Sequence, residues 1–138
     1  MILKKIYGWE GFELSQGDLK VGLTPTIGGR IMSLKFKDQE LLFVDPKHTA
    51  ETFNLQQWSN PTEAKKALGF RVWGGDKTWI APQSNWLEGI PPLDLDAAPY
   101  SFQWQDQQAI MTSPVCRETG VQIIRRVGFK EGNLHLIE

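Results

Sequence analysis

The segment 32–37 reads Met32-Ser33-Leu34-Lys35-Phe36-Lys37, an unbroken alternation of apolar and polar residues. Successive side chains of a β-strand point to opposite faces, so this period of two predicts a strand with one buried face. Asp38-Gln39 is typical of a tight turn, and residues 40–44 are expected to return as the partner strand of a hairpin. The segment therefore predicts antiparallel β-structure.

The same pattern recurs toward both ends of the chain. Residues 2–24 are expected to form a meander of short strands, and residues 100–113 and 121–138 predict two further hairpins. Many short strands joined by turns favour an all-β fold, specifically an antiparallel β-sandwich. The length suits one domain, so residues 1–138 are interpreted as a single domain.

One short helix is expected, on the rim of the sheet protein. Asn60 suits the N-cap, Pro61 the first helical position, and Gly69 the C-terminal cap, so residues 61–68 predict about two turns. By contrast, the adjacent prolines of residues 87–98 predict an irregular loop.

Two acidic residues in that loop have the spacing of candidate metal ligands. Asp94 and Asp96 resemble half of a calcium-binding loop, but the glycine and the distal Glu of such a loop are missing. We therefore expect both carboxylates to be solvated, and we expect no metal and no cofactor.

Composition limits the function classes. The chain has 15 Lys and Arg against 16 Asp and Glu, so no global field would recruit nucleic acid or an anionic membrane. No apolar run has the length of a membrane span, and no secretory signal is recognisable. The single Cys116 cannot form an internal disulfide. These features predict a cytoplasmic protein whose partner is a small molecule.

Half of the six tryptophans lie within residues 69–86, interspersed with charged and amide side chains. Flat aromatic rings stack on the C–H face of a sugar, and neighbouring polar groups can bind its hydroxyls. The segment therefore predicts a carbohydrate site. The candidate substrate-binding residues are Arg30, Arg71, Trp73, Asp76, Lys77, Trp79, Gln83 and Trp86; catalytic residues are not assigned.

Strand alternation in residues 77–80 would place Lys77 and Trp79 on one face, which favours them as a binding pair. Other interpretations remain open. Tryptophans beside a Gly-Gly turn also serve as core packing. Arg30 could instead be a structural arginine that pairs with backbone or a carboxylate. Adjacent Asp76 and Lys77 could be a solvated pair.

A family resemblance follows from two motifs. Residues 25–42 match the pattern P-x-I-G-G-R-I-x-S-L-x-x-x-x-x-E-L-L, which resembles the start of the galactose mutarotase-like superfamily. Residues 74–82 match G-G-x-K/R-x-W-x-A-P, which is similar to uncharacterised members of that superfamily. The resemblance implies a mutarotase-like supersandwich, of which this chain would be the N-terminal portion.

The resemblance implies carbohydrate binding or, in a complete protein, an aldose or sugar-phosphate 1-epimerase, which is an isomerase. Aldose 1-epimerases use a His and a Glu as acid and base, and the Glu lies in the C-terminal part. Neither His48 nor His135 lies in a matching context, so we expect this chain alone to be inactive.

Two further expectations concern partners. A structural β-domain that contacts proteins through its aromatic patch is the remaining alternative function. The strand at 134–138 is expected to lack a partner and to permit homo-oligomers through its edge.

Overall fold

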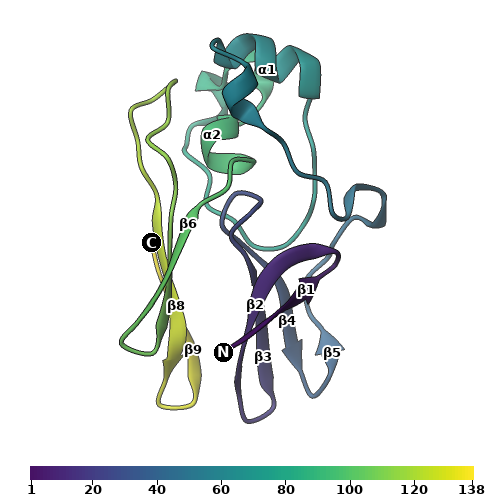
Figure 1. Cartoon of the computed structure of the whole chain (residues 1–138), viewed down its shortest axis with the longest axis vertical. Coiled ribbons are helices and arrows are strands. Elements are labelled where there is room, and N and C mark those ends of the chain that lie inside the picture. Colours follow the sequence, from purple (N-terminus) through teal and green to yellow (C-terminus); the bar gives the residue numbers. More distant parts are fainter.

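Nine strands form two antiparallel sheets in the computed structural model, which describes residues 1–138. The first sheet contains β1 (Ile2–Ile6), β2 (Trp9–Gln16), β3 (Leu19–Thr24), β4 (Arg30–Phe36) and β5 (Gln39–Glu40). The second contains β6 (Ser101–Gln105), β7 (Gln108–Thr112), β8 (Ile124–Lys130) and β9 (Asn133–Ile137). Figure 1 shows the two sheets beside each other, with the segment that joins them beyond one end. The predicted β-rich, antiparallel character is confirmed.

Each strand pairs with its neighbour in the sequence, so both sheets are meanders. Residues 2–24 form three strands as predicted, and β8 begins at Ile124, three residues later than the expected 121. β9 pairs only with β8 and is therefore an edge strand of its sheet. Self-association through this edge stays a prediction.

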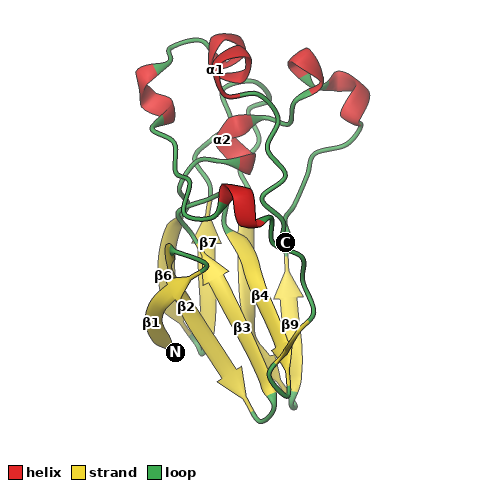
Figure 2. Ribbon diagram, turned by 90° about the vertical axis from the view of Figure 1, so that its right-hand side faces the viewer, coloured by secondary structure: helices red, strands yellow, loops and turns green.

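The segment between the sheets carries the helices, which Figure 2 shows gathered beyond one end of the strands. The helix α1 (Pro61–Leu68) has the predicted bounds. Asn60 Oδ1 accepts a hydrogen bond from the Thr62 N–H (2.9 Å), and the Gly69 N–H donates to the Lys65 carbonyl. The remaining helical turns are short and of the 3-10 type; they cover Pro46–His48, Leu55–Gln57, Gln83–Asn85 and Leu87–Gly89.

A second α-helix was not predicted. α2 (Leu93–Asp96) lies within the segment 87–98 that was expected to be an irregular loop. Its prolines precede the helix rather than interrupt it, and Pro92 is the N-cap residue. A proline at the start of a helix removes only an N–H that would have no partner within the helix.

The predicted strand at 40–44 is also corrected. Only Gln39 and Glu40 pair with β4, and the chain then leaves the sheet. The Glu40 side chain contributes to the early end, because its Oε1 accepts from the N–H groups of Leu34 and Leu42. The Leu41 N–H still donates to the Leu34 carbonyl of β4 (2.8 Å) and makes a longer contact with Glu40 Oε1 (3.2 Å). Val44 instead forms an isolated antiparallel bridge with Gly74, which brings the tryptophan-rich segment alongside.

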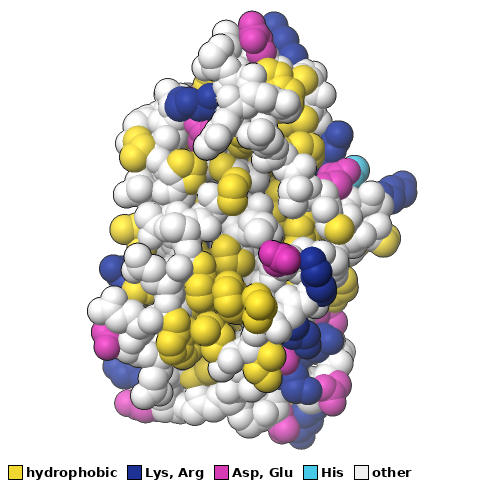
Figure 3. Space-filling view, viewed as in Figure 1, with side chains coloured by type: hydrophobic (Ala, Val, Ile, Leu, Met, Phe, Trp, Pro, Cys, Tyr) yellow, Lys and Arg dark blue, Asp and Glu magenta, His cyan; other side chains and the backbone are white.

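Two buried clusters form the core. The first draws apolar residues from both sheets, among them Leu14, Val21, Met111 and Val127. At its border, Phe12 of β2 stacks on Phe102 of β6 with ring centroids 3.8 Å apart. Figure 3 shows hydrophobic side chains gathered along the line between the sheets. The second cluster lies toward the helices and includes Trp9, Ile27, Trp73, Leu93 and Ala97.

We expect Gly74→Ala to destabilise the protein more than Gly120→Ala. Both glycines have a positive φ, 93° and 70°, so both substitutions introduce backbone strain. Only at Gly74 would the new Cβ overlap other atoms, because it would meet the Phe43 carbonyl, whereas Gly120 has open space. The overlap should add roughly 1–3 kcal/mol to the loss of unfolding free energy. Urea denaturation checks this, and equal losses in the two variants would contradict it.

Candidate functional site

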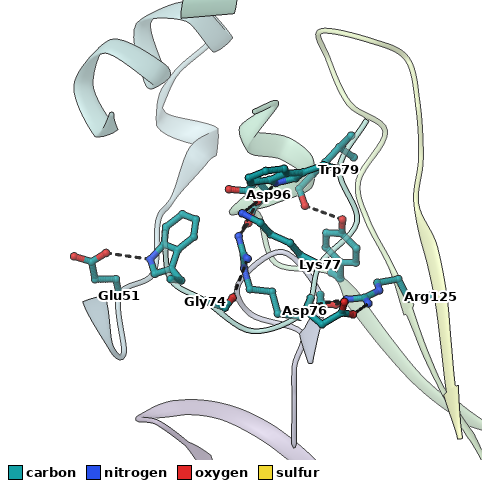
Figure 4. A network of polar contacts seen from close by, with 12 residues as sticks. Glu51, Gly74, Asp76, Lys77, Trp79, Asp96 and Arg125 are labelled. Carbon is teal, nitrogen blue, oxygen red and sulfur yellow. Dashed lines mark hydrogen bonds and ion pairs between the residues drawn. The ribbon is translucent and has the colours of Figure 1, made fainter. Parts of the chain in front are cut away.

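The candidate site is centred on the carboxylate of Asp96, the last residue of α2. Its Oδ1 accepts hydrogen bonds from Arg30 Nη2 (2.7 Å), Trp79 Nε1 (2.9 Å) and Lys77 Nζ (3.1 Å). Figure 4 shows these groups converging from the tryptophan-rich segment and α2. One carboxylate oxygen therefore joins β4, α2 and the segment that follows Gly74-Gly75.

Backbone pairing places the tryptophan-rich segment against β4. The Ile31 N–H donates to the Asp76 carbonyl (3.1 Å), and the Asp76 N–H donates back to the Ile31 carbonyl (2.8 Å). Residues 77–80 do not form the predicted strand. Lys77 and Trp79 nevertheless point to the same place, because both donate to Asp96. The two side chains thus lie together, although not through the predicted strand, and their role as a binding pair stays a prediction.

Burial determines the electrostatics of the site. The side chains of Arg30 and Asp96 are 0% and 2% exposed, so their ion pair is shielded from water. Burial lowers the pKa of Arg30, against the opposing effect of the Asp96 charge. Burial also lowers the pKa of Lys77 to about 8; the nearby Arg30 charge acts in the same direction, and Asp96 opposes both. Lys77 is thus a cation that loses its proton at a lower pH than an ordinary lysine.

The outer part of the site is aromatic. Trp79 is 42% exposed, and Lys77 Nζ lies 3.8 Å from the centroid of its ring. Trp86 is almost buried and meets Trp79 edge to face, with centroids 4.9 Å apart. No protein hydrogen bond reaches Asp96 Oδ2, because all three donors use Oδ1. An accessible indole and an amine therefore meet at the surface, and the almost fully buried Asp96 carboxylate lies behind them.

The structure separates the other predicted residues from this group. Trp73 is 1% exposed in the second core cluster, with its Nε1 donating to Glu51. Asp76 pairs with Arg125, not with Lys77. Arg71 lies 3.7 Å from Glu51, and Gln83 is exposed in the turn Gln83–Asn85. The interpretation of Asp76-Lys77 as a solvated pair is wrong, because each residue has a partner elsewhere.

Arg30 has a structural role, because it pairs with a carboxylate and with backbone carbonyls. Besides Asp96, it donates to the Gly74 carbonyl (3.2 Å), and its guanidinium lies 5.0 Å from the centroid of the Trp73 ring. With no exposed surface, Arg30 is not available to a ligand directly. It acts on the site through Asp96.

Asp96 is the central residue of the site, and it was not among the binding residues predicted from the sequence. It was expected to be solvated with Asp94, but the two residues are 3% and 7% exposed. Arg117 binds both oxygens of Asp94, through Nη2 (2.8 Å) and Nε (2.9 Å). The sequence did contain a signal for the burial of these two acids, because they alternate with Leu93 and Leu95 and are followed by Ala97-Ala98. No group of three or more His, Cys, Asp or Glu side chains is arranged to hold a metal ion.

A larger cavity lies away from this site. It has a volume of about 780 Å³ and runs between residues 52–56 and residues 114–117. Its charged wall consists of Asp94 and Arg117, which already satisfy each other. The rest of its polar lining is neutral and consists of Thr52, Asn54 and Gln56.

No family model, curated protein or solved structure matches this chain. Neither the eight residues of α1 nor the four of α2 suffice to cross a membrane.

We expect Asp96→Asn to destabilise the fold much more than Asp76→Asn. The first change leaves the buried Arg30 without its counter-charge, a loss of about 3–5 kcal/mol for a broken buried pair. After the second change, Arg125 keeps Glu138 and the Gly29 carbonyl. Asp76 is itself 46% exposed, so a loss of about 1 kcal/mol is expected. Chemical denaturation measures both, and similar losses would contradict the role given to Asp96.

We expect Lys77 to become reactive toward acylating reagents near pH 8, because only the neutral amine is a nucleophile and its pKa is lowered to about 8. Lys20 is the internal control, since its hydrogen bond to Asp38 raises its pKa above the ordinary value. Trace acetylation followed by mass spectrometry gives the labelling of each peptide against pH. A Lys77 profile that coincides with that of Lys20 would refute the expectation.

Proposed function

We propose that this chain binds carbohydrate at the surface formed by Lys77 and Trp79, which the buried Asp96 holds in position. The observation that carries the proposal is the partly exposed Trp79 indole, held beside a fixed amine and a carboxylate. A sugar combines an apolar C–H face with hydroxyl groups that both donate and accept. The indole suits the apolar face and Lys77 donates to a hydroxyl oxygen, while the buried Asp96 carboxylate holds both side chains in position.

Preorganisation supports the proposal. Trp79 and Lys77 are restrained by their bonds to Asp96, and Trp79 also packs against Trp86. Side chains that are already ordered lose little conformational entropy when a ligand binds. Mobile side chains on an ordinary surface would lose more conformational entropy on binding.

The proposed fold is a mutarotase-like β-sandwich. Support comes from the two antiparallel meanders, the core cluster with residues of both sheets, and the position of the Gly74-Gly75 motif beside β4. In this proposal the sugar site lies at the end of the sheets where the helices gather, and Arg30 of the first motif positions Asp96 next to the second motif.

A sugar 1-epimerase is the second candidate, and the lowered pKa of Lys77 is the observation that favours it. A base with a pKa near 8 can exchange protons at neutral pH. Mutarotation requires an acid and a base on different sides of the sugar ring, whereas Lys77 and Asp96 lie 3.1 Å apart and bond each other. His48 contacts Glu51 and His135 lies on β9, so neither imidazole supplements this pair. Binding is therefore the function we favour.

We expect Trp79→Ala and Lys77→Gln each to weaken binding of a monosaccharide glycoside by roughly 1–3 kcal/mol, the scale of a lost aromatic contact or charged hydrogen bond. Thr78→Val is the matched control between them. Thr78 Oγ1 is buried without a hydrogen-bond partner, so its removal should leave both affinity and melting temperature unchanged or slightly improved. Calorimetric titration with methyl glycosides of glucose, galactose and mannose measures the affinities.

Two results would count against the proposal. One is the absence of binding by every glycoside. The other is a folded Lys77→Gln protein with wild-type affinity. If Trp79→Ala lowered only the melting temperature, the aromatic group would be packing or a protein contact. Polarimetry with glucose and galactose tests for epimerase activity. An epimerase would increase the rate of mutarotation in proportion to the protein concentration.

A further inference from the structure

A second cavity borders the candidate site. Its volume is about 210 Å³, and Ile80 and Trp86 form part of its wall. Trp86 is the residue that meets Trp79 edge to face. Trp86 therefore contacts both the cavity and the exposed indole.

The cavity combines apolar walls with one carboxylate. Pro82, Leu87 and Pro92 extend the apolar lining, and Glu118 is the charged residue. The Glu118 side chain is only 6% exposed, and its Oε2 accepts from Lys65 Nζ (2.7 Å). No protein donor reaches its Oε1. A carboxylate oxygen that has no protein donor and lies at the wall of a cavity can accept a hydrogen bond from an occupant.

Charge favours a neutral donor. Lys65 is fully buried behind Glu118 and also donates to the Leu87 carbonyl (3.2 Å). The Lys65–Glu118 pair is thus neutral as a unit, so it offers little attraction to a cationic ligand. A hydroxyl group satisfies Oε1 without adding a charge to the cavity.

Size restricts the occupant further. Cavities that enclose a drug-sized ligand are about 300–1,000 Å³. The present cavity is smaller, at about 210 Å³, which suits one small ring rather than an extended molecule.

We propose, on the basis of the proposed carbohydrate binding, that this cavity is the subsite for a second sugar ring. The ligand class is then a disaccharide or a longer glycan. The first ring lies against Trp79 with Lys77 at its hydroxyls. The second ring lies against the other side of the Trp86 wall and donates a hydroxyl to Glu118 Oε1.

The experiment compares maltose, cellobiose and lactose with the methyl glycosides of their constituent sugars by calorimetric titration. At least one disaccharide should bind tenfold more tightly or better than its methyl glycosides. Asn85→Phe should place a ring in the cavity, because Asn85 lines it and its side chain makes no hydrogen bond. That variant should bring the affinity for the disaccharide to within about threefold of the affinity for the glycoside.

Ser84→Phe is the matched control, because Ser84 is exposed in the same turn and does not line the cavity. It should keep the full preference for the disaccharide. The proposal is overturned if glycosides bind and disaccharides bind no more tightly, or if Asn85→Phe keeps the preference. It is also overturned if Asn85→Phe weakens binding of the glycoside, because the first ring would then occupy the cavity. In each of these cases carbohydrate binding itself stands; if no saccharide binds the wild-type protein, both proposals fail.

Discussion

Arg30 carries a full charge with no exposed surface, and much of the arrangement around it follows from the free-energy cost of that burial. The guanidinium donates hydrogen bonds to the Asp96 carboxylate and to the carbonyl oxygens of Gly74 and Asp96. Its Nε remains buried without a partner, so the compensation is incomplete. Asp96 must therefore face inward, and the short helix that contains it must dock beside the start of β4.

A second buried arginine fixes the same segment from the opposite side. Arg125 of β8 donates to the carbonyls of Gly29 and Asp76 and pairs with the Asp76 carboxylate. Asp76 and Lys77 are adjacent in the chain but serve different clusters, one toward the second sheet and one toward α2. The segment after Gly74-Gly75 thus lies between two guanidinium groups, which explains how an irregular backbone can hold Lys77 and Trp79 in position.

Local pattern predicted the strands and α1 because their determinants are close in sequence. The alternation of 32–37 and the caps Asn60 and Gly69 act within a few residues. α2 and the early end of β5 were missed because they depend on side chains that meet only in the fold, such as the Glu40 carboxylate that takes three backbone N–H groups. Trp73 and Trp79 are chemically identical and six residues apart, yet one is buried and the other is 42% exposed. The difference arises from distant partners, Glu51 for Trp73 and Asp96 for Trp79.

The use of a single Asp96 oxygen by Arg30, Lys77 and Trp79 has a consequence for how such a protein can diversify. Most substitutions at Asp96 would alter the site and endanger folding at once, so this part of the surface can change only slowly. The neighbouring turn at Gln83, Ser84 and Asn85 is exposed, and its side chains make no hydrogen bonds. Variation can accumulate there with little effect on the fold. A mutant library designed to redirect ligand preference would therefore randomise the turn and keep the Asp96 cluster constant.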